Sequence, residues 1–161
     1  MRKLITYIIL FFSFFLYSQE PLFTLVDNSK TGIDFSNDLV DTKEHSIFLY
    51  ANYYGGAGVG IGDFDNDGLE DIFFAANLVD DKIYKNLGNF QFEDKTKMSG
   101  IINNGSWSTG VTVADVNNDG LLDIYVSCEL YDDLPYLRTN KLYINEGDFK
   151  FKESAKNWVL M

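Results

Sequence analysis

Apolar residues along this chain fall in short runs, separated by turns rich in Gly, Asn and Asp. Val, Ile, Phe and Tyr dominate these runs, and such residues favour strands over helices. Within a run, apolar and polar positions alternate, which is typical of strands with one buried face. The pattern predicts an all-β fold, and 46% apolar with 16% aromatic residues is enough to build a packed core.

The pattern also repeats within the chain. Residues 58–72 return as residues 110–124, and residues 82–92 return as residues 141–151. The sequence separation between the two copies is larger for the second pair of segments than for the first. The second copy therefore holds an insertion, which falls in residues 129–140. Repeats of this length are typical of solenoids and propellers, in which insertions map to loops on one face.

Each copy predicts four short strands, joined by Gly-containing turns. The turns at Gly88 and Gly147 place glycine where a tight hairpin needs a positive φ. We therefore expect two four-stranded antiparallel blades of a β-propeller-type repeat array, as a fragment of a larger propeller. The expected strands are 57–62, 71–76, 81–86 and 90–94 in the first repeat, residues 50–101, and 110–114, 123–128, 141–145 and 149–153 in the second, residues 102–161.

The N-terminal region predicts export followed by a connection. Arg2 and Lys3 precede an apolar run, residues 4–16, and polar residues follow Ser18, so residues 1–18 are expected to be a secretory signal peptide. The run is shorter than the roughly 20 residues of a membrane span, and no stable span is expected after signal removal. Residues 19–49 are expected to form a connecting segment. Residues 23–33 loosely resemble the end of the first repeat, residues 92–101, and are a candidate closing strand.

Charge and cysteine content exclude some classes of function. The net charge of −11 argues against a nucleic-acid partner, because phosphate binding needs clustered Lys and Arg. The single cysteine, Cys128, cannot form a disulfide within the chain and is expected to be a buried thiol. The single histidine, His45, lies in an unrelated segment, so no catalytic residue is predicted.

Much of the acidity falls in two loops with the same spacing of oxygen donors. Side-chain oxygens at positions 1, 3, 5 and 9, with a backbone carbonyl from position 7, can wrap a hard cation. Glycine at position 6, Gly68 or Gly120, permits the sharp reversal. The predicted ligands are Asp63, Asp65, Asp67, Leu69 and Asp71 in the first loop, and Asp115, Asn117, Asp119, Leu121 and Asp123 in the second, with both leucine side chains directed to the core.

The donor types favour Ca²⁺ at both sites. An EF-hand closes with Glu at position 12, whereas Phe74 and Val126 stand there, so these loops join strands. Mg²⁺ demands a stricter octahedral geometry, and Zn²⁺ prefers His or Cys, which both loops lack. The first loop carries four carboxylates and the second three, which predicts that the first binds Ca²⁺ more tightly.

With these loops, each preceded by a Gly-Val strand and followed by Leu-x-Asp-Ile, the chain resembles FG-GAP and VCBS repeats over residues 50–160. These repeats occur in integrin α-chain propellers and in bacterial secreted proteins. The small-residue run at residues 55–58 adds to the likeness. The resemblance implies one repeat per blade, Ca²⁺ between the first two strands, placement outside the cell or at its surface, further blades, and a role in adhesion or ligand binding.

Three functions remain open at this stage. The first is a non-catalytic, Ca²⁺-rigidified module that binds an extracellular protein or carbohydrate, and we expect the chain not to be an enzyme by itself. The second is part of a propeller-type polysaccharide-degrading enzyme, with two carboxylates in catalysis. The third is an assembly element that completes a partner's sheet, because two blades leave strand edges exposed. The carboxylates available to the enzyme are Glu93, Asp94, Glu129, Asp132, Asp133 and Glu153.

Overall fold

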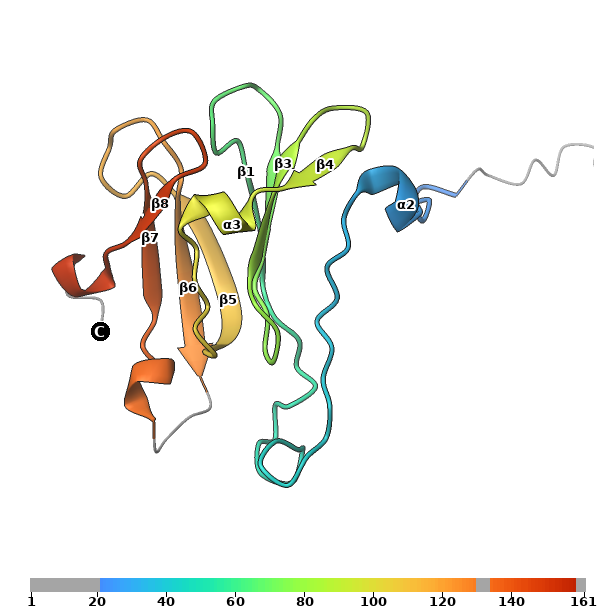
Figure 1. The fold of residues 1–161 in the computed structure, drawn as a ribbon, viewed down its shortest axis with the longest axis vertical. Coiled ribbons are helices and arrows are strands. Elements are labelled where there is room, and N and C mark those ends of the chain that lie inside the picture. The colour runs from blue at the N-terminus through green and yellow to red at the C-terminus, as the bar shows by residue number, and fades with distance from the viewer. Residues whose placement is uncertain (1–20, 130–133, 159–161) are drawn as a thin grey trace, which may run out of the picture.

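The computed structural model describes residues 21–129 and 134–158, so the predicted signal peptide lies outside the described residues. It contains two four-stranded antiparallel sheets, which confirms the predicted fold class (Figure 1). In the described residues, no helix has the length and apolar character needed to cross a membrane.

Each sheet is a simple meander in which every strand pairs with the next along the chain. The first sheet contains β1 (Val59–Gly62), β2 (Asp71–Phe74), β3 (Lys82–Asn86) and β4 (Phe92–Asp94), and the second contains β5 (Trp107–Ala114), β6 (Asp123–Glu129), β7 (Lys141–Asn145) and β8 (Phe151–Glu153). The short helices are α2 (Asn28–Thr31), α3 (Thr96–Ser99), η1 (Pro135–Leu137) and η2 (Ala155–Trp158). The predicted insertion falls between β6 and β7, where η1 lies.

Glycine sets both outer hairpins, as predicted. Gly88 has a φ of 81° and Gly147 a φ of 86°, in the left-handed region that glycine enters without a steric penalty. Hydrogen bonds from Leu87 N to Gln91 O at 2.8 Å and from Glu146 N to Lys150 O at 2.7 Å close the two turns. These turns fix the register of β3 with β4 and of β7 with β8.

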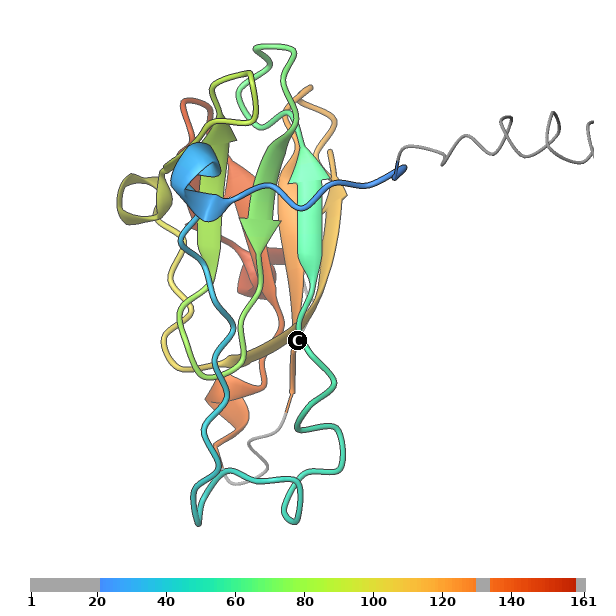
Figure 2. The ribbon, with the colours of Figure 1, turned by 90° about the vertical axis from the view of Figure 1, so that its right-hand side faces the viewer.

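The two sheets lie face to face, and the core fills the space between them (Figure 2). A stripe of glycines on β1 and just before it lets the sheets approach closely. A Cβ on Gly60 would lie 2.7 Å from Val111 Cγ1 and 2.9 Å from Val113 Cγ2. The buried core cluster comprises Phe64, Phe73, Ala75, Ile83, Ile101, Ile124, Val126, Cys128, Tyr143, Phe149 and Phe151.

The candidate closing strand does not form in the described residues, because residues 21–50 contain no strand. They contain the helical turn α2 instead. Asp27 caps its N-terminus by accepting a hydrogen bond from Ser29 N at 2.8 Å, and Gly32, with a φ of 75°, ends it. These local signals override the extended conformation that the sequence pattern predicted.

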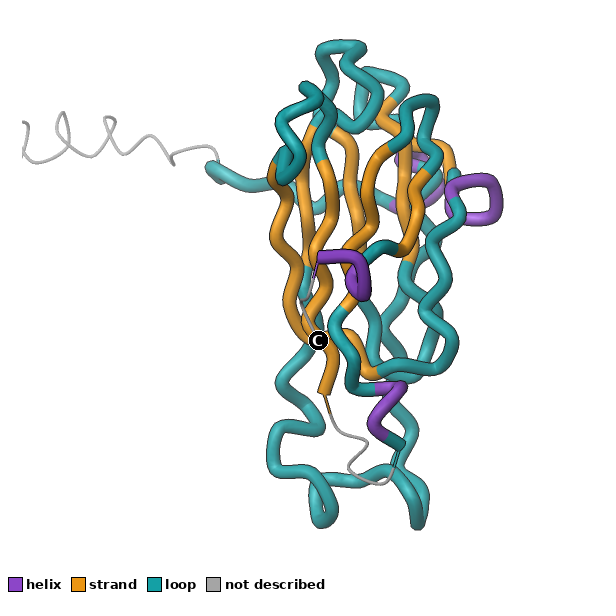
Figure 3. The backbone as a smooth tube through the Cα atoms, turned by 90° about the vertical axis from the view of Figure 1, so that its left-hand side faces the viewer, coloured by secondary structure: helices purple, strands orange, loops and turns teal. Residues whose placement is uncertain are grey.

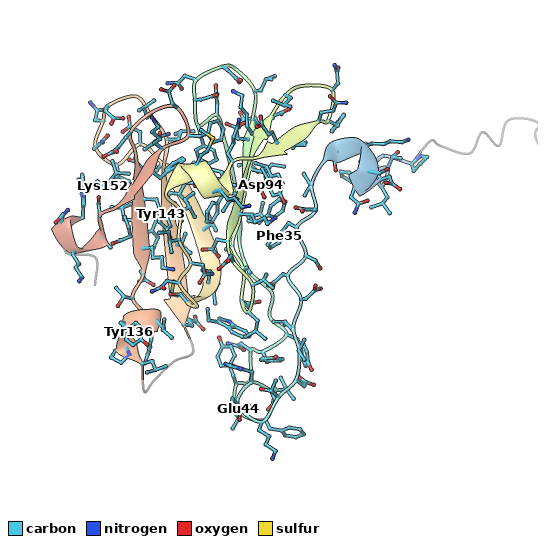
Figure 4. All side chains as sticks on the ribbon, in the orientation of Figure 1. Phe35, Glu44, Asp94, Tyr136, Tyr143 and Lys152 are labelled. Carbon is cyan, nitrogen blue, oxygen red and sulfur yellow. The ribbon has the colours of Figure 1, made fainter. Side chains whose placement is uncertain are left out.

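The sequence similarity behind that prediction nevertheless reflects a structural equivalence. Turn α2 lies on the first sheet as α3 lies on the second: a Cβ on Gly32 would lie 2.6 Å from Phe92 O, and a Cβ on Gly100 would lie 2.6 Å from Phe151 O. Just after α2, Phe35 stacks on the first sheet, on Phe74, with ring centroids 4.7 Å apart (Figure 4). Residues 28–35 thus cover the first blade.

Candidate metal centre

Both predicted loops lie at the same end of the molecule, where β1 turns into β2 and β5 turns into β6 (Figure 1), and Figure 3 shows strands ending in loops there. Residues 63–70 form the first loop and residues 115–122 the second, and each is followed by an aspartate that opens the next strand. The predicted connection between two strands is therefore confirmed. The structure contains the same loop twice, once in each blade.

Asp71, at position 9 of the first loop, is fully buried at the start of β2. Its Oδ1 accepts a hydrogen bond from Asn86 N at 2.8 Å, and its Oδ2 accepts one from Phe64 N at 2.9 Å. Burial raises the pKa of Asp71 to about 6, although these two hydrogen bonds favour the charged form. This carboxylate therefore ties the loop to β3 before any metal is considered.

Asp123 repeats the arrangement at the start of β6. Its Oδ1 accepts from Asn145 N at 2.8 Å and its Oδ2 from Val116 N at 3.0 Å, with 1% of the residue exposed. The Asn145 side chain also donates to Leu122 O at 3.1 Å and, across the blade boundary, to Phe64 O at 2.8 Å. An asparagine on the third strand thus braces each loop. The two asparagines are aligned in the repeat, but sequence reasoning did not assign them this role.

The turn of the first loop is held by Asp63. Its two oxygens accept from Asp67 N at 3.0 Å and Gly68 N at 2.8 Å. Gly68 has a φ of 87°, which confirms the predicted reversal at position 6. Asn66, at position 4, also has a positive φ, 58°, a conformation that asparagine tolerates better than most residues.

The second loop has the same backbone. Asp115 accepts from Asp119 N at 3.1 Å and from Gly120 N at 2.9 Å, and these backbone hydrogen bonds, led by the one from Gly120, lower the pKa of Asp115. Gly120 has a φ of 87° and Asn118 a φ of 62°. The two loops therefore match in turn geometry at positions 1, 4, 5, 6 and 9.

In the first loop, three of the predicted ligands converge. One oxygen each from Asp63, Asp65 and Asp71 lies within 4.8 Å of the others, the one such acidic group in the described part of the chain. Asp65 Oδ1 is buried and has no hydrogen-bond partner in the structure. Such an oxygen lacks the compensation that buried polar atoms normally have, and a hard cation would supply it. This donor set fits Ca²⁺.

Sequence reasoning missed a lysine in this group. The Lys85 ammonium, on β3, donates to Asp65 and, at 2.7 Å, to Asp67. Burial opposes the charged form, but these two carboxylates outweigh it and raise the pKa of Lys85 above its ordinary value. Lys85 also lies over the ring of Phe149 in the second blade, 5.5 Å from its centroid.

In the second loop, the side chains at positions 3 and 5 have different hydrogen-bond partners from those in the first loop. Asn117 Nδ2 donates to Asp119 Oδ2 at 2.8 Å, and Asn117 Oδ1 accepts from Asp119 N at 3.0 Å. The other oxygen of Asp119 accepts from Leu121 N at 2.9 Å. The partner of Asp119 is thus the uncharged amide of Asn117, which cannot neutralise a carboxylate. The other two carboxylates of this loop accept hydrogen bonds from backbone N–H groups.

The predicted leucine side chains are placed differently from expectation. Leu69 is 37% exposed and Leu121 is half-buried, and neither belongs to the core cluster. The following residue in the second loop, Leu122, packs against the core instead. The prediction that Leu69 and Leu121 side chains fill the core is thus wrong, because the loop ends one residue later. Their carbonyls as ligands stay a prediction.

The carboxylates considered for polysaccharide cleavage have structural partners. Glu93 pairs with Lys95 at 2.8 Å, and Asp94 pairs with Lys82 at 2.9 Å. Glu129 accepts from the Tyr50 hydroxyl, and Glu153 accepts from Ala155 N at 2.8 Å. Asp132 and Asp133 lie outside the described residues.

The family comparison covers both loops. Residues 63–126 match the model of the FG-GAP-like repeat, from the first position of the first loop to the middle of β6. A search of curated proteins gives no match. The matched segment, the two equivalent loops and the two meander sheets agree with one another, and residues 63–126 are similar to an FG-GAP-like repeat.

Proposed function

We propose that this chain is a secreted, Ca²⁺-binding repeat module of a β-propeller type, and that it binds an extracellular protein or carbohydrate. The observation that carries the proposal is the duplicated loop: two connections with the same backbone turn present oxygen donors at the same positions. The buried, unpartnered Asp65 Oδ1 supports it, because a cation would complete its coordination. The FG-GAP family favours an extracellular location.

The residues that would hold the ions are those at positions 1, 3, 5 and 9 of each loop, with the carbonyl of position 7. A bound Ca²⁺ would neutralise carboxylates that otherwise repel one another. The loops are already in contact, since Asn66 Nδ2 donates to Gly120 O at 3.2 Å. We expect the ions to be structural and to stiffen the end of the molecule where the two blades meet.

Calorimetric titration of the purified chain with calcium tests the proposal. We expect two binding sites, each weakened when one position-5 carboxylate is changed, Asp67→Asn or Asp119→Asn, because the substitution removes one negative charge from the site. These substitutions keep the Oδ1 acceptors for Leu69 N and Leu121 N, so they remove charge while preserving the turn. Alanine at Asp71 or Asp123 is a poorer choice, because it removes acceptors for buried backbone N–H groups.

A second measurement asks whether the ions are structural. The unfolding temperature should fall when a chelator removes calcium, and it should fall less in a chain carrying both Asp67→Asn and Asp119→Asn. Extracellular calcium modules bind with dissociation constants as weak as about 10⁻³ M, so the titration must reach millimolar calcium. No heat at that concentration, with no change in unfolding temperature, contradicts the proposal.

The proposed binding role is supported by the similarity to FG-GAP repeats and by no pocket in the described residues. Its test is therefore a direct measurement of binding. We expect the chain to retain specific members of a panel of extracellular proteins and glycans in calcium and to release them in chelator. Turnover of a polysaccharide by the chain would instead favour the enzyme reading. Retention that is equal in calcium and in chelator would separate ligand binding from the metal loops.

A second candidate, contact with a further blade of the same kind, rests on a separate observation. Val111 and Val113 of β5 pack on the glycine stripe of β1, and the matching residues of β1, Val59 and Ile61, are 53% and 61% exposed. They are suited to the glycine stripe of another blade. Light scattering should show concentration-dependent association that Ile61→Asp abolishes, and a monomer at all concentrations contradicts this reading.

A further inference from the structure

The two loops differ most in what faces their carboxylates from the neighbouring strand. Lys85 lies on β3 next to Asn86, the residue that braces the first loop, and its ammonium binds Asp65 and Asp67. At the matching position of the second blade, next to Asn145, β7 has Ile144. None of the ion pairs in the described residues involves an acidic residue of the second loop.

Lys85 is held in place by more than charge. Only 21% of its side chain is exposed, and its ammonium lies over the Phe149 ring of the second blade. Phe149 itself is 3% exposed, whereas the matching residue of the first hairpin, Phe90, is 71% exposed. The lysine is therefore enclosed between its own loop and the next blade, and a Ca²⁺ ion would have to displace it from Asp65 and Asp67.

We propose that Lys85 is a tethered cation of the first loop, which neutralises part of its charge without metal and lowers its affinity for Ca²⁺. The second loop, which has no such cation among the described residues, is then the tighter Ca²⁺ site. This inference rests on the proposed function for its statement about affinity, but the neutralisation of the first loop stands independently of calcium.

The charges of the two loops agree with this order. Four carboxylates and one ammonium give the first loop the same formal charge as the three carboxylates of the second, so the extra aspartate gives no net advantage. In addition, a Ca²⁺ ion entering the first loop must break two charge-assisted hydrogen bonds, which are among the strongest in proteins. This order is the reverse of the one that the carboxylate count alone predicts.

Hydrogen exchange measured by mass spectrometry reads the two loops separately in the unaltered chain. Calcium should protect residues 115–123 at a concentration at least about tenfold lower than residues 63–71, because each of the two charge-assisted hydrogen bonds lost in the first loop contributes roughly that factor. In chelator, residues 63–71 should already be the better protected. Protection of residues 63–71 at the lower calcium concentration would overturn the proposal.

Two exchanged substitutions test the lysine itself. Lys85→Ile should strengthen calcium binding to the first loop at least about tenfold, and Ile144→Lys should weaken binding to the second loop by a similar factor. Lys82→Ile serves as the control, since it removes the ion pairs with Asp34 and Asp94 outside both loops. Its calcium affinities should match those of the unaltered chain.

A measurement in chelator distinguishes this proposal from the proposed function. There, Lys85→Ile should increase hydrogen exchange in residues 63–71 severalfold relative to the Lys82→Ile control, because gathered carboxylates lose their only cation in the described structure. Unchanged exchange overturns the proposal even if both loops bind calcium. If no variant binds calcium, the proposed function and the affinity order fail, while increased exchange still establishes Lys85 as the cation.

Discussion

The close approach of the two blades depends on Gly60, and replacing it with alanine tests that packing. The new Cβ would lie 2.7 Å from Val111 Cγ1 and 2.9 Å from Val113 Cγ2, both inside van der Waals contact. Neither valine can yield easily, because a β-branched side chain has few χ1 alternatives and both belong to the interface with the core. The sheets must therefore separate or β5 must shift.

The expected cost follows from two opposing effects. Overpacking a closely packed interior costs about 1–3 kcal/mol, whereas replacing glycine by alanine in a strand recovers about 0.5–1 kcal/mol of conformational entropy. The net loss in the free energy of unfolding should be about 1–2 kcal/mol. Urea denaturation of the purified chain, followed by tryptophan fluorescence, measures it, because Trp107 is buried at the start of β5.

Gly110 on β5, which matches Gly58 in the repeat, provides the control. A Cβ there would meet Ser127 Oγ at 3.6 Å and Ser127 Cβ at 3.7 Å, which is ordinary contact. Gly110→Ala should therefore leave stability unchanged or raise it by up to about 1 kcal/mol. Equal effects of the two substitutions would refute the argument that the glycine stripe of β1 sets the distance between the blades.

Three further predictions concern residues other than the predicted metal ligands. Asp81→Ala should cost about 3 kcal/mol or more in urea denaturation, since it removes the acceptor for Ala76 N at 2.8 Å and for Ser108 Oγ at 3.1 Å; Asp81→Asn should cost less. The Cys128 thiol should react with a thiol reagent at neutral pH only after unfolding, because burial raises its pKa and covers it. Asn118→Ala should cost about 1 kcal/mol, and Asn118→Gly less, because the φ of Asn118 is 62°.

Local signals were enough to predict the strands and the backbone of both loops. Gly88 and Gly147 fix hairpins through their own φ angles, and Gly68 and Gly120 fix the loop reversals in the same way. These effects depend on a residue and its immediate neighbours, so they can be read directly from the sequence. Because the chain carries the pattern twice, the second copy also tests the interpretation of the first.

The role of Lys85 could not be read in this way. It lies on a strand well separated in sequence from Asp65 and Asp67. The aligned residue of the second repeat is Ile144, so the repeat pattern does not point to a lysine at this position. Only the pairing of β2 with β3 brings the lysine back over the loop. The helical turn α2 was missed for a different reason: Asp27 and Gly32 are strong local signals for a helical turn, but the resemblance of residues 23–33 to residues 92–101 favoured a strand.

The hydrogen bonds of Asp71 and Asp123 bear on what calcium can do in this fold. Both carboxylates already accept two backbone N–H groups each, so the loops are tied to β3 and β7 without metal. Metal binding can drive folding only where the unbound chain has no preformed site, as in small zinc domains. Here the site is largely built by backbone hydrogen bonds, and in the first loop Lys85 supplies a charge as well. Calcium should therefore stiffen two existing turns and raise the unfolding temperature, and the blades should keep their strands when it is removed.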